Sequence, residues 1–248
     1  ASISPRHRTL LAIEARIFRD PRQTILCNSR LVAADLERRH FVPAERLEVI
    51  YNGVDLERFH PRERDSLGAR LRSELGVDGA LALFVGSGFA RKGLDRAIAG
   101  LAASGVKAEL LVAGAGDPGP FQRQAEALGV GSRLRFLGVR SDVEALYAAA
   151  DLLVLPTRYD PFANACLEAM AAGLAVATTP SNGAAELLVD GANGFVCDQD
   201  FSSAFRALEN PRRLRELGDA ARTTAERFGW SAHADAVLAL WHRLRARA

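Results

Sequence analysis

The sequence predicts an α/β protein built on a doubly wound, parallel, Rossmann-like sheet. Two observations predict this class. From about residue 80, short apolar runs alternate with stretches of helical length, and the runs themselves lack the polar alternation of a strand with one solvated face. Runs that are apolar throughout suit strands covered on both faces. Repeated strand–helix units imply parallel strands joined by right-handed crossovers.

The elements follow in order along the chain. We expect strands over residues 81–86, 108–114, 133–138, 151–156 and 174–179, with a shorter last strand over 194–197. The stretches after the first five predict helices over 92–103, 119–129, 141–150, 163–173 and 183–191. The tail predicts two helices, because Pro211 suits a first helical turn and Gly229 suits a break between helices. Ser231 is the expected N-cap of the second.

Residues 1–60 do not fit this repeat. They hold a helical stretch, the apolar run "TILCNS" and a second helix-like stretch, "RLVAADLERRH". This resembles the closing part of another α/β unit, and alone it is too short to bury a core. The dipeptide Asn52-Gly53 is a strong turn signal and places a boundary near residues 52–62. We therefore divide the chain into residues 1–52, a main domain over 53–228 and a C-terminal helix over 229–248.

Composition excludes several classes of protein. There is no run of eighteen apolar residues and no signal-peptide core at the N-terminus. Three cysteines without CxxC spacing favour reduced thiols and a cytoplasmic protein, and five scattered histidines support no metal site. The net charge of +2 combines basic ends with an acidic middle. The basic ends are solvated helix faces or attract an anionic lipid or phosphorylated acceptor; nucleic acid is excluded as a partner.

The stretch "FVGSGFARKGLDRAI" reads as a strand, a glycine loop and a helix start. Gly86 and Gly88 let the backbone approach a ligand closely, and unpaired N–H groups gather at a helix N-terminus. Arg91 and Lys92 stand at the mouth of that helix and would suit a pyrophosphate. The alternative is a tight turn with two solvated cations. The chain has only two lysines, Lys92 and Lys107, which slightly favours the phosphate reading.

Two further glycine loops follow strands. "GAGDPG" at 114–119 matches GxGxxG, but its prolines delay the helix and no acidic residue stands where a dinucleotide ribose needs one, so a dehydrogenase is disfavoured. "LGVR" at 137–140 either presents Arg140 to a ligand or is a plain loop.

The stretch "YDPFANACLEAM" places Asp160 in a loop and Glu168 about one turn into the following helix. Free N–H groups are expected at the helix start, on Phe162, Ala163 and Asn164. The non-functional alternatives are that Asp160 only interacts with the positive end of the helix dipole, and that Glu168 lies on an exposed helix face. Because Glu168 lies in an alanine-rich helix that we expect to be buried, its carboxylate needs a partner, which favours a ligand.

Together these motifs resemble the retaining GT-B glycosyltransferases of the family-four group. Asp160 and Glu168, followed by "AMAAG", resemble the E-x7-E element, while "GSGFARKG" and "NGVD" resemble the phosphate loop and the linker between lobes. "RHRT" and "FVGS…RKGLDR" are similar to lipopolysaccharide core glucosyltransferases. The resemblance implies a donor-binding C-terminal lobe, with residues 1–52 as the remnant of an N-terminal lobe. We expect such a fragment to transfer little sugar.

The resemblance also implies roles for individual residues. Arg91 and Lys92 would neutralise the diphosphate, and Glu168 would bind the ribose. The remaining roles belong to the phosphate loop (Gly86 and Ser87), the uracil contact (Val139 and Arg140) and the donor-sugar contact (Asp160 with the amides of Phe162, Ala163 and Asn164). The first acid is usually Glu in the family, so Asp160 leaves the donor sugar open.

The expected reaction is retaining transfer of a hexose, glucose by preference, from a UDP-sugar to a lipopolysaccharide core acceptor. Neither metal nor other cofactor is expected. The protein would be cytoplasmic, with peripheral contact at the inner membrane. The alternative is a non-catalytic nucleotide- or sugar-binding α/β module. A GT-B enzyme of another kind, such as an epimerase or a starch-type synthase, would differ in its base preference.

Overall fold

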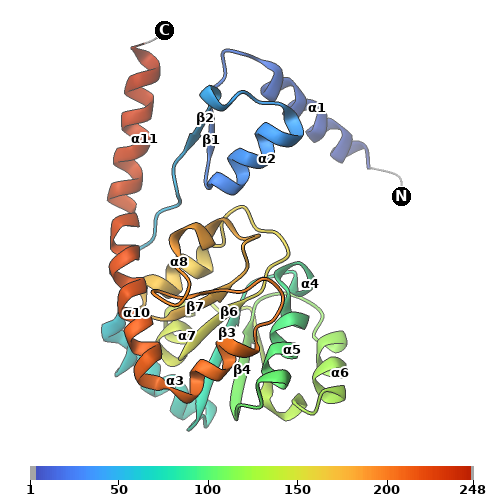
Figure 1. The fold of residues 1–248 in the computed structure, drawn as a ribbon, viewed down its shortest axis with the longest axis vertical. Coiled ribbons are helices and arrows are strands. Elements are labelled where there is room, and N and C mark those ends of the chain that lie inside the picture. Colours follow the sequence, from blue (N-terminus) through green and yellow to red (C-terminus); the bar gives the residue numbers. More distant parts are fainter. Residues whose placement is uncertain (1–3, 247–248) are drawn as a thin grey trace.

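A six-stranded parallel sheet forms the centre of the larger part of the chain in the computed structural model, which describes residues 4–246 (Figure 1). Its strands lie in the order β5-β4-β3-β6-β7-β8, and every pair is parallel. Within this sheet, the chain first forms β3 in the middle and then adds β4 and β5 on one side. It then returns to form β6 on the other side of β3 and adds β7 and β8 beyond it. This order confirms the predicted doubly wound fold and puts its switch point between β3 and β6.

The strands lie within a residue or two of the predicted runs. Their bounds are β3 Ala80–Val85, β4 Ala108–Ala113, β5 Leu134–Gly138, β6 Leu152–Leu155, β7 Ala175–Thr178 and β8 Phe195–Val196. All four residues of β6 and the four central residues of β3 are fully buried. Helices cover both faces of these strands, which is why the sequence shows no polar alternation there.

The helices of the larger part pack as two groups. α5 (Leu94–Ser104) contacts α6 (Gly119–Ala127) and α9 (Ser202–Arg206). In the second group, α3 (Leu67–Leu75) contacts α7 (Val143–Ala149), and α8 (Asn164–Ala171) contacts α10 (Pro211–Ala225). The short helix α4 (Phe89–Lys92) precedes α5. Single 3-10 turns complete the part: η2 Pro61–Arg64, η3 Gly131–Arg133, η5 Ala207–Glu209 and η6 Glu226–Phe228.

Two details of the predicted helices were wrong. The predicted helix over 183–191 is only a 3-10 turn, η4 (Gly183–Leu187), which starts where Asn182 Oδ1 accepts the Ala184 N–H. The N-cap of the last helix, α11 (Trp230–Arg245), is Gly229 and not Ser231. Pro211 does begin α10, and Gly229 does separate the last two helices, as predicted.

The N-terminal part forms its own small sheet. It contains α1 (Pro5–Arg19), β1 (Ile25–Cys27), α2 (Arg30–His40), η1 (Ala44–Arg46) and β2 (Leu47–Val49), with β1 parallel to β2. α11 runs beside it (Figure 1), and Arg243 pairs with Glu48 at 3.1 Å. The division into three domains stays a prediction. No helix within residues 4–246 has the length and apolar character needed to cross a membrane.

Candidate functional site

The loops that carry the predicted site residues leave the carboxyl ends of three strands of the six-stranded sheet. Residues 86–93 follow β3, residues 156–163 follow β6, and residues 139–142 follow β5. In open α/β sheets, ligands bind in the crevice beyond these ends, at the switch point. Here the switch point lies between β3 and β6, so the first two loops flank it directly.

A buried ion pair joins these two loops. Lys92 Nζ lies 2.5 Å from Asp160 Oδ2, and only 12% and 8% of the two side chains are exposed. Arg91 Nη1 lies 3.2 Å from the same oxygen, although the Arg91 side chain is half exposed. The structure therefore brings together the three residues predicted to be catalytic. Their pairing also means that Asp160 neutralises much of the cationic charge expected to face a diphosphate.

Glycines allow the two loops to come this close. Gly93 has φ +78°, and a Cβ there would lie 1.9 Å from the Pro156 carbonyl oxygen. The Lys92 stem crosses Gly86, where a Cβ would approach its methylenes to 3.3 Å. The backbone N–H of Arg158 donates to the Arg91 carbonyl at 2.9 Å, which fastens the turn to the second loop. Lys92 thus lies across Gly86, while the predicted close approach of a ligand to this glycine stays a prediction.

The start of α8 differs from the expectation. Three free amides were predicted, but the Phe162 N–H donates to Asp160 Oδ1 at 3.3 Å and the Ala163 N–H donates to Asn182 Oδ1 at 3.0 Å. Both amides are buried, and buried N–H groups are almost always paired. Among residues 4–246, the Asn164 N–H has no recorded acceptor and remains open to a ligand.

Asn182 is a site residue that sequence reasoning missed. It is 99% buried, and its amide nitrogen donates to Thr178 Oγ1 at 3.0 Å and to Cys166 Sγ at 3.3 Å. With Ala163 it fixes the entry into α8. The signal in the sequence was the Asn182-Gly183 dipeptide, which is typical of a turn.

Glu168 already has a protein partner. The Tyr147 hydroxyl donates to Glu168 Oε2 at 2.8 Å. Burial raises the pKa of the Glu168 carboxyl, while the Tyr147 hydrogen bond and nearby Arg58 oppose the rise. The exposed-face alternative was wrong, because Glu168 is half-buried. Within the described part of the chain, no recorded hydrogen bond or ion pair links Glu168 to Arg91 or Lys92, so their convergence on one ligand stays a prediction.

The remaining predicted residues, Ser87, Val139 and Arg140, lie in the loops after β3 and β5. Ser87 Oγ accepts the Ala115 N–H at 3.1 Å and so ties the loop after β3 to the loop after β4. The Val139 residue is 76% exposed. Arg140 forms two hydrogen bonds with Asp142, at 2.8 and 2.5 Å, and this pairing raises the pKa of Arg140 and lowers the pKa of Asp142. A uracil contact by Val139 and Arg140 stays a prediction.

The glycines of the GxGxxG match at residues 114–119 have a structural role. A Cβ on Gly114 would lie 2.2 Å from the Gly86 carbonyl oxygen, and one on Gly116 would lie 2.6 Å from the Phe89 ring. These glycines let the loop after β4 pack under the glycine loop after β3. They serve the packing of loop on loop, which explains why the motif appears without the rest of a dinucleotide site.

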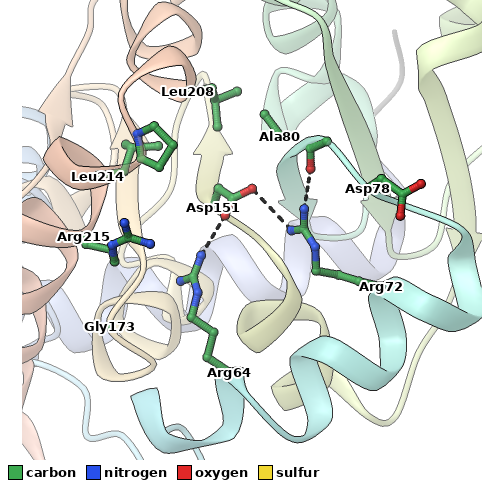
Figure 2. Close-up of a pocket in the computed structure, with 11 residues that line it drawn as sticks. Arg64, Arg72, Asp78, Ala80, Asp151, Gly173, Leu208, Leu214 and Arg215 are labelled. Atoms are coloured by element: carbon green, nitrogen blue, oxygen red, sulfur yellow. Dashed lines mark hydrogen bonds and ion pairs between the residues drawn. The ribbon is translucent and has the colours of Figure 1, made fainter.

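Two cavities lie on different sides of the sheet. A groove of about 730 Å³ separates α2 from the loops after β6 and β7, and it is lined by Arg38, Arg39, Arg158 and Tyr159 among others. A cavity of about 330 Å³ lies at the amino ends of β3 and β6, where Arg64 and Arg72 both bind Asp151 (Figure 2). Its position, at the edge opposite the carboxyl ends, sets it apart from the predicted donor site. Residues 4–246 contain no cluster of His, Cys, Asp and Glu that could hold a metal ion.

Comparison with known proteins matches this chain to two family models. The model of glycosyl transferases group 1 covers residues 70–224, and the model of glycosyltransferase family 4 covers residues 1–58. The lipopolysaccharide glucosyltransferase WaaG of Escherichia coli K12 is 32% identical over 207 residues, which cover 81% of this chain and 55% of WaaG. A D-inositol 3-phosphate glycosyltransferase of Catenulispora acidiphila is 31% identical over 244 residues, covering 90% and 57%. The chain thus spans about half the length of these relatives.

Solved structures agree in fold. The crystal structure of WaaG superposes with a TM-score of 0.83 at 29% identity, covering 94% of this chain and 67% of that one. Anabaena Alr3699/HepE, solved in complex with UDP and glucose, gives a TM-score of 0.84 at 24% identity, covering 97% and 69%. The second likeness concerns the fold alone. With its doubly wound parallel sheet and a group 1 model matching more than half its length, the chain belongs to the GT-B glycosyl transferases of group 1.

Proposed function

We propose that this chain is the donor-binding part of an enzyme that transfers a hexose, glucose by preference, from a UDP-sugar to a lipopolysaccharide core acceptor with retention of configuration. The observation that carries the proposal is the buried Lys92–Asp160 pair, placed beyond the carboxyl ends of β3 and β6 where the sheet reverses direction. The likeness to WaaG supports glucose and the lipopolysaccharide acceptor; the inositol-phosphate relatives show that acceptors vary within the family.

Lys92 and Arg91 would stabilise the leaving group. When UDP departs from the anomeric carbon, negative charge grows on its diphosphate. A cation that is fixed in position before the reaction stabilises this charge without having to move. Asp160 would hold the Lys92 ammonium in such a position, beside the expected diphosphate. Removal of one such preorganised donor typically costs about 2.7–4 kcal/mol, or roughly 10²–10³ in kcat. The open Asn164 N–H at the start of α8 would add a neutral donor.

The donor sugar and the nucleoside would lie on either side of the diphosphate. Asp160 Oδ1 faces the loop at Phe162, near the expected sugar. Glu168 would exchange or share its Tyr147 hydrogen bond with the ribose hydroxyls. The exposed Val139 and the Arg140–Asp142 pair would border the uracil.

The acceptor would approach from the side of α2. Arg38, Arg39 and Arg158 line the groove between α2 and the loop at Tyr159. Asp35 pairs with the first two and Asp95 with the third, which leaves one positive charge in excess among these five side chains. An excess of positive charge suits an acceptor that carries phosphate or carboxylate groups. Contact with the inner membrane stays a prediction.

Titration calorimetry with UDP, ADP and GDP tests the proposal. We expect this chain to bind UDP, and to bind it more tightly than either purine nucleotide. A titration with UDP that gives neither heat nor a thermal shift contradicts the donor assignment, while tighter ADP or GDP binding indicates a GT-B enzyme of another kind. UDP-glucose consumption that needs truncated lipopolysaccharide, measured on the longer protein, separates a transferase from a binding module.

A further inference from the structure

A carboxylate from the larger part of the chain caps the helix α2 of the N-terminal part. Glu186, in η4, accepts the Leu31 N–H through Oε1 at 2.7 Å and the Arg30 N–H through Oε2 at 2.9 Å. The Tyr51 hydroxyl donates to Oε2 at 2.8 Å. The first N–H groups of a helix lack partners within the helix, and a carboxylate there also meets the positive end of the helix dipole. Ser29 is the local N-cap of α2 and accepts the Val32 N–H at 3.2 Å, so Glu186, 155 positions from Leu31, satisfies two further N–H groups of the first turn.

Two further contacts fasten the same region to the donor loop. Ser29, which is fully buried, donates through Oγ to the Pro161 carbonyl at 2.6 Å. Gly183 makes room for it, because a Cβ there would lie 2.5 Å from Ser29 Oγ and 2.0 Å from the Pro161 oxygen. Asn52 Nδ2 donates to Asn164 Oδ1 at 2.7 Å. The contacts therefore reach both ends of residues 160–164.

Glu186 stands apart from the other contacts in being exposed and charged. The Ser29–Pro161 contact is buried and neutral, so it depends on a close fit of the two parts. The Glu186 carboxylate accepts three hydrogen bonds, and hydrogen bonds to a charged acceptor are stronger than those between neutral groups. Its loss would loosen the fit without leaving a buried group unpaired.

We propose that Glu186 is a positioning residue: it docks residues 29–52 onto residues 160–164 and so holds Asp160 and the start of α8 in the arrangement that binds the donor. The part of this proposal that concerns the donor rests on the proposed function. Because the same contacts touch the binding loop, docking and donor binding are coupled. Such coupling is reciprocal, so donor binding must tighten docking by the factor by which docking tightens binding.

Glu186→Gln tests the proposal in the chain as it is. Glutamine keeps the shape but offers one acceptor oxygen, and its NH₂ group faces an N–H donor of α2. Hydrogen–deuterium exchange is followed in peptides covering residues 29–36 and 160–167, without ligand and with UDP. We expect faster exchange in both peptides, and a UDP dissociation constant at least about fivefold higher, the lower end of typical coupling.

Glu216→Gln is the matched control. Glu216 is a glutamate of α10 whose recorded partners are Arg212 and Arg213 of its own helix, so its loss removes the same charge without touching α2. Tyr51→Phe is a milder variant that removes one of the three hydrogen bonds, and it should change both readouts in the same direction by less.

Three results would overturn the proposal. Unchanged exchange over 29–36 would mean that Glu186 does not hold α2. Faster exchange over 29–36 with unchanged exchange over 160–167 would mean that docking does not reach the donor loop. An unchanged UDP affinity in Glu186→Gln would mean that docking does not position the binding residues. If the wild-type chain binds no UDP, the proposed function fails by itself, and exchange over 160–167 alone decides the positioning role.

Discussion

Replacing Lys92 by methionine should destabilise the protein by about 3 kcal/mol. Removing one partner of a buried ion pair typically costs about 3–5 kcal/mol, because the other charge stays buried without it. The Asp160 residue is 6% exposed, so this rule applies to it. Arg91 remains 3.2 Å from its Oδ2 and Phe162 N remains 3.3 Å from its Oδ1, which places the loss at the lower end. Methionine keeps the stem that packs against Gly86.

Urea unfolding measures this loss. With a slope of about 3 kcal/mol per molar urea, a loss of about 3 kcal/mol moves the midpoint down by about 1 M. Lys107→Met is the matched control, since Lys107 is the only other lysine and is exposed; its effect should stay within about 0.5 kcal/mol. The double variant with Asp160→Asn should lose less than the sum of the single variants. A loss for Lys92→Met no greater than for Lys107→Met would refute a buried pair.

Two other substitutions test the roles of Glu168 and Gly93. Burial raises the pKa of Glu168, so the folded protein holds that proton more tightly than the unfolded chain, and the stability that this group contributes falls as the pH rises above about 4.5. The stability of Glu168→Gln, measured by urea unfolding, should therefore rise relative to wild type between about pH 4 and pH 7. The same variant should bind UDP about 10- to 100-fold more weakly, because it loses a charged hydrogen bond to the ribose. An unchanged UDP affinity would disprove the ribose contact. Gly93→Ala should cost at least about 3 kcal/mol, since left-handed backbone strain adds to the clash with Pro156, whereas Gly105→Ala, at φ +73° with open space around it, should cost only about 1–2 kcal/mol. Equal losses for the two glycines would show that the loop after β3 can move away from Pro156.

The fold could be predicted because its signal is local. Strands such as β3 and β6 are covered by helices on both faces, so their burial is written in the sequence as unbroken apolar runs. The turn η4 was misread as a helix because its pattern of apolar residues suits either one. Asn182 caps this turn by accepting the Ala184 N–H, as it would cap an α-helix, so the cap signal did not distinguish the two.

The candidate site was predictable by residue type and less so by partner. The Lys92 and Asp160 loops follow strands that flank the switch point, so the sequence order already brings them to one edge. The partner of Glu168 was not predictable, because Tyr147 lies on another helix, 21 residues away, and nothing in its surroundings marks its hydroxyl. The contact of Glu186 with α2 has no sequence signal at all, since it joins residues about 155 positions apart in the chain.

The most direct test is a crystal structure of this chain with UDP bound. The account predicts the diphosphate against Lys92 and the start of α8, with the ribose hydroxyls on Glu168 and the base beside Val139. UDP lodged instead in the Arg64–Arg72 cavity at the other edge of the sheet, or a ribose turned away from Glu168, would contradict it.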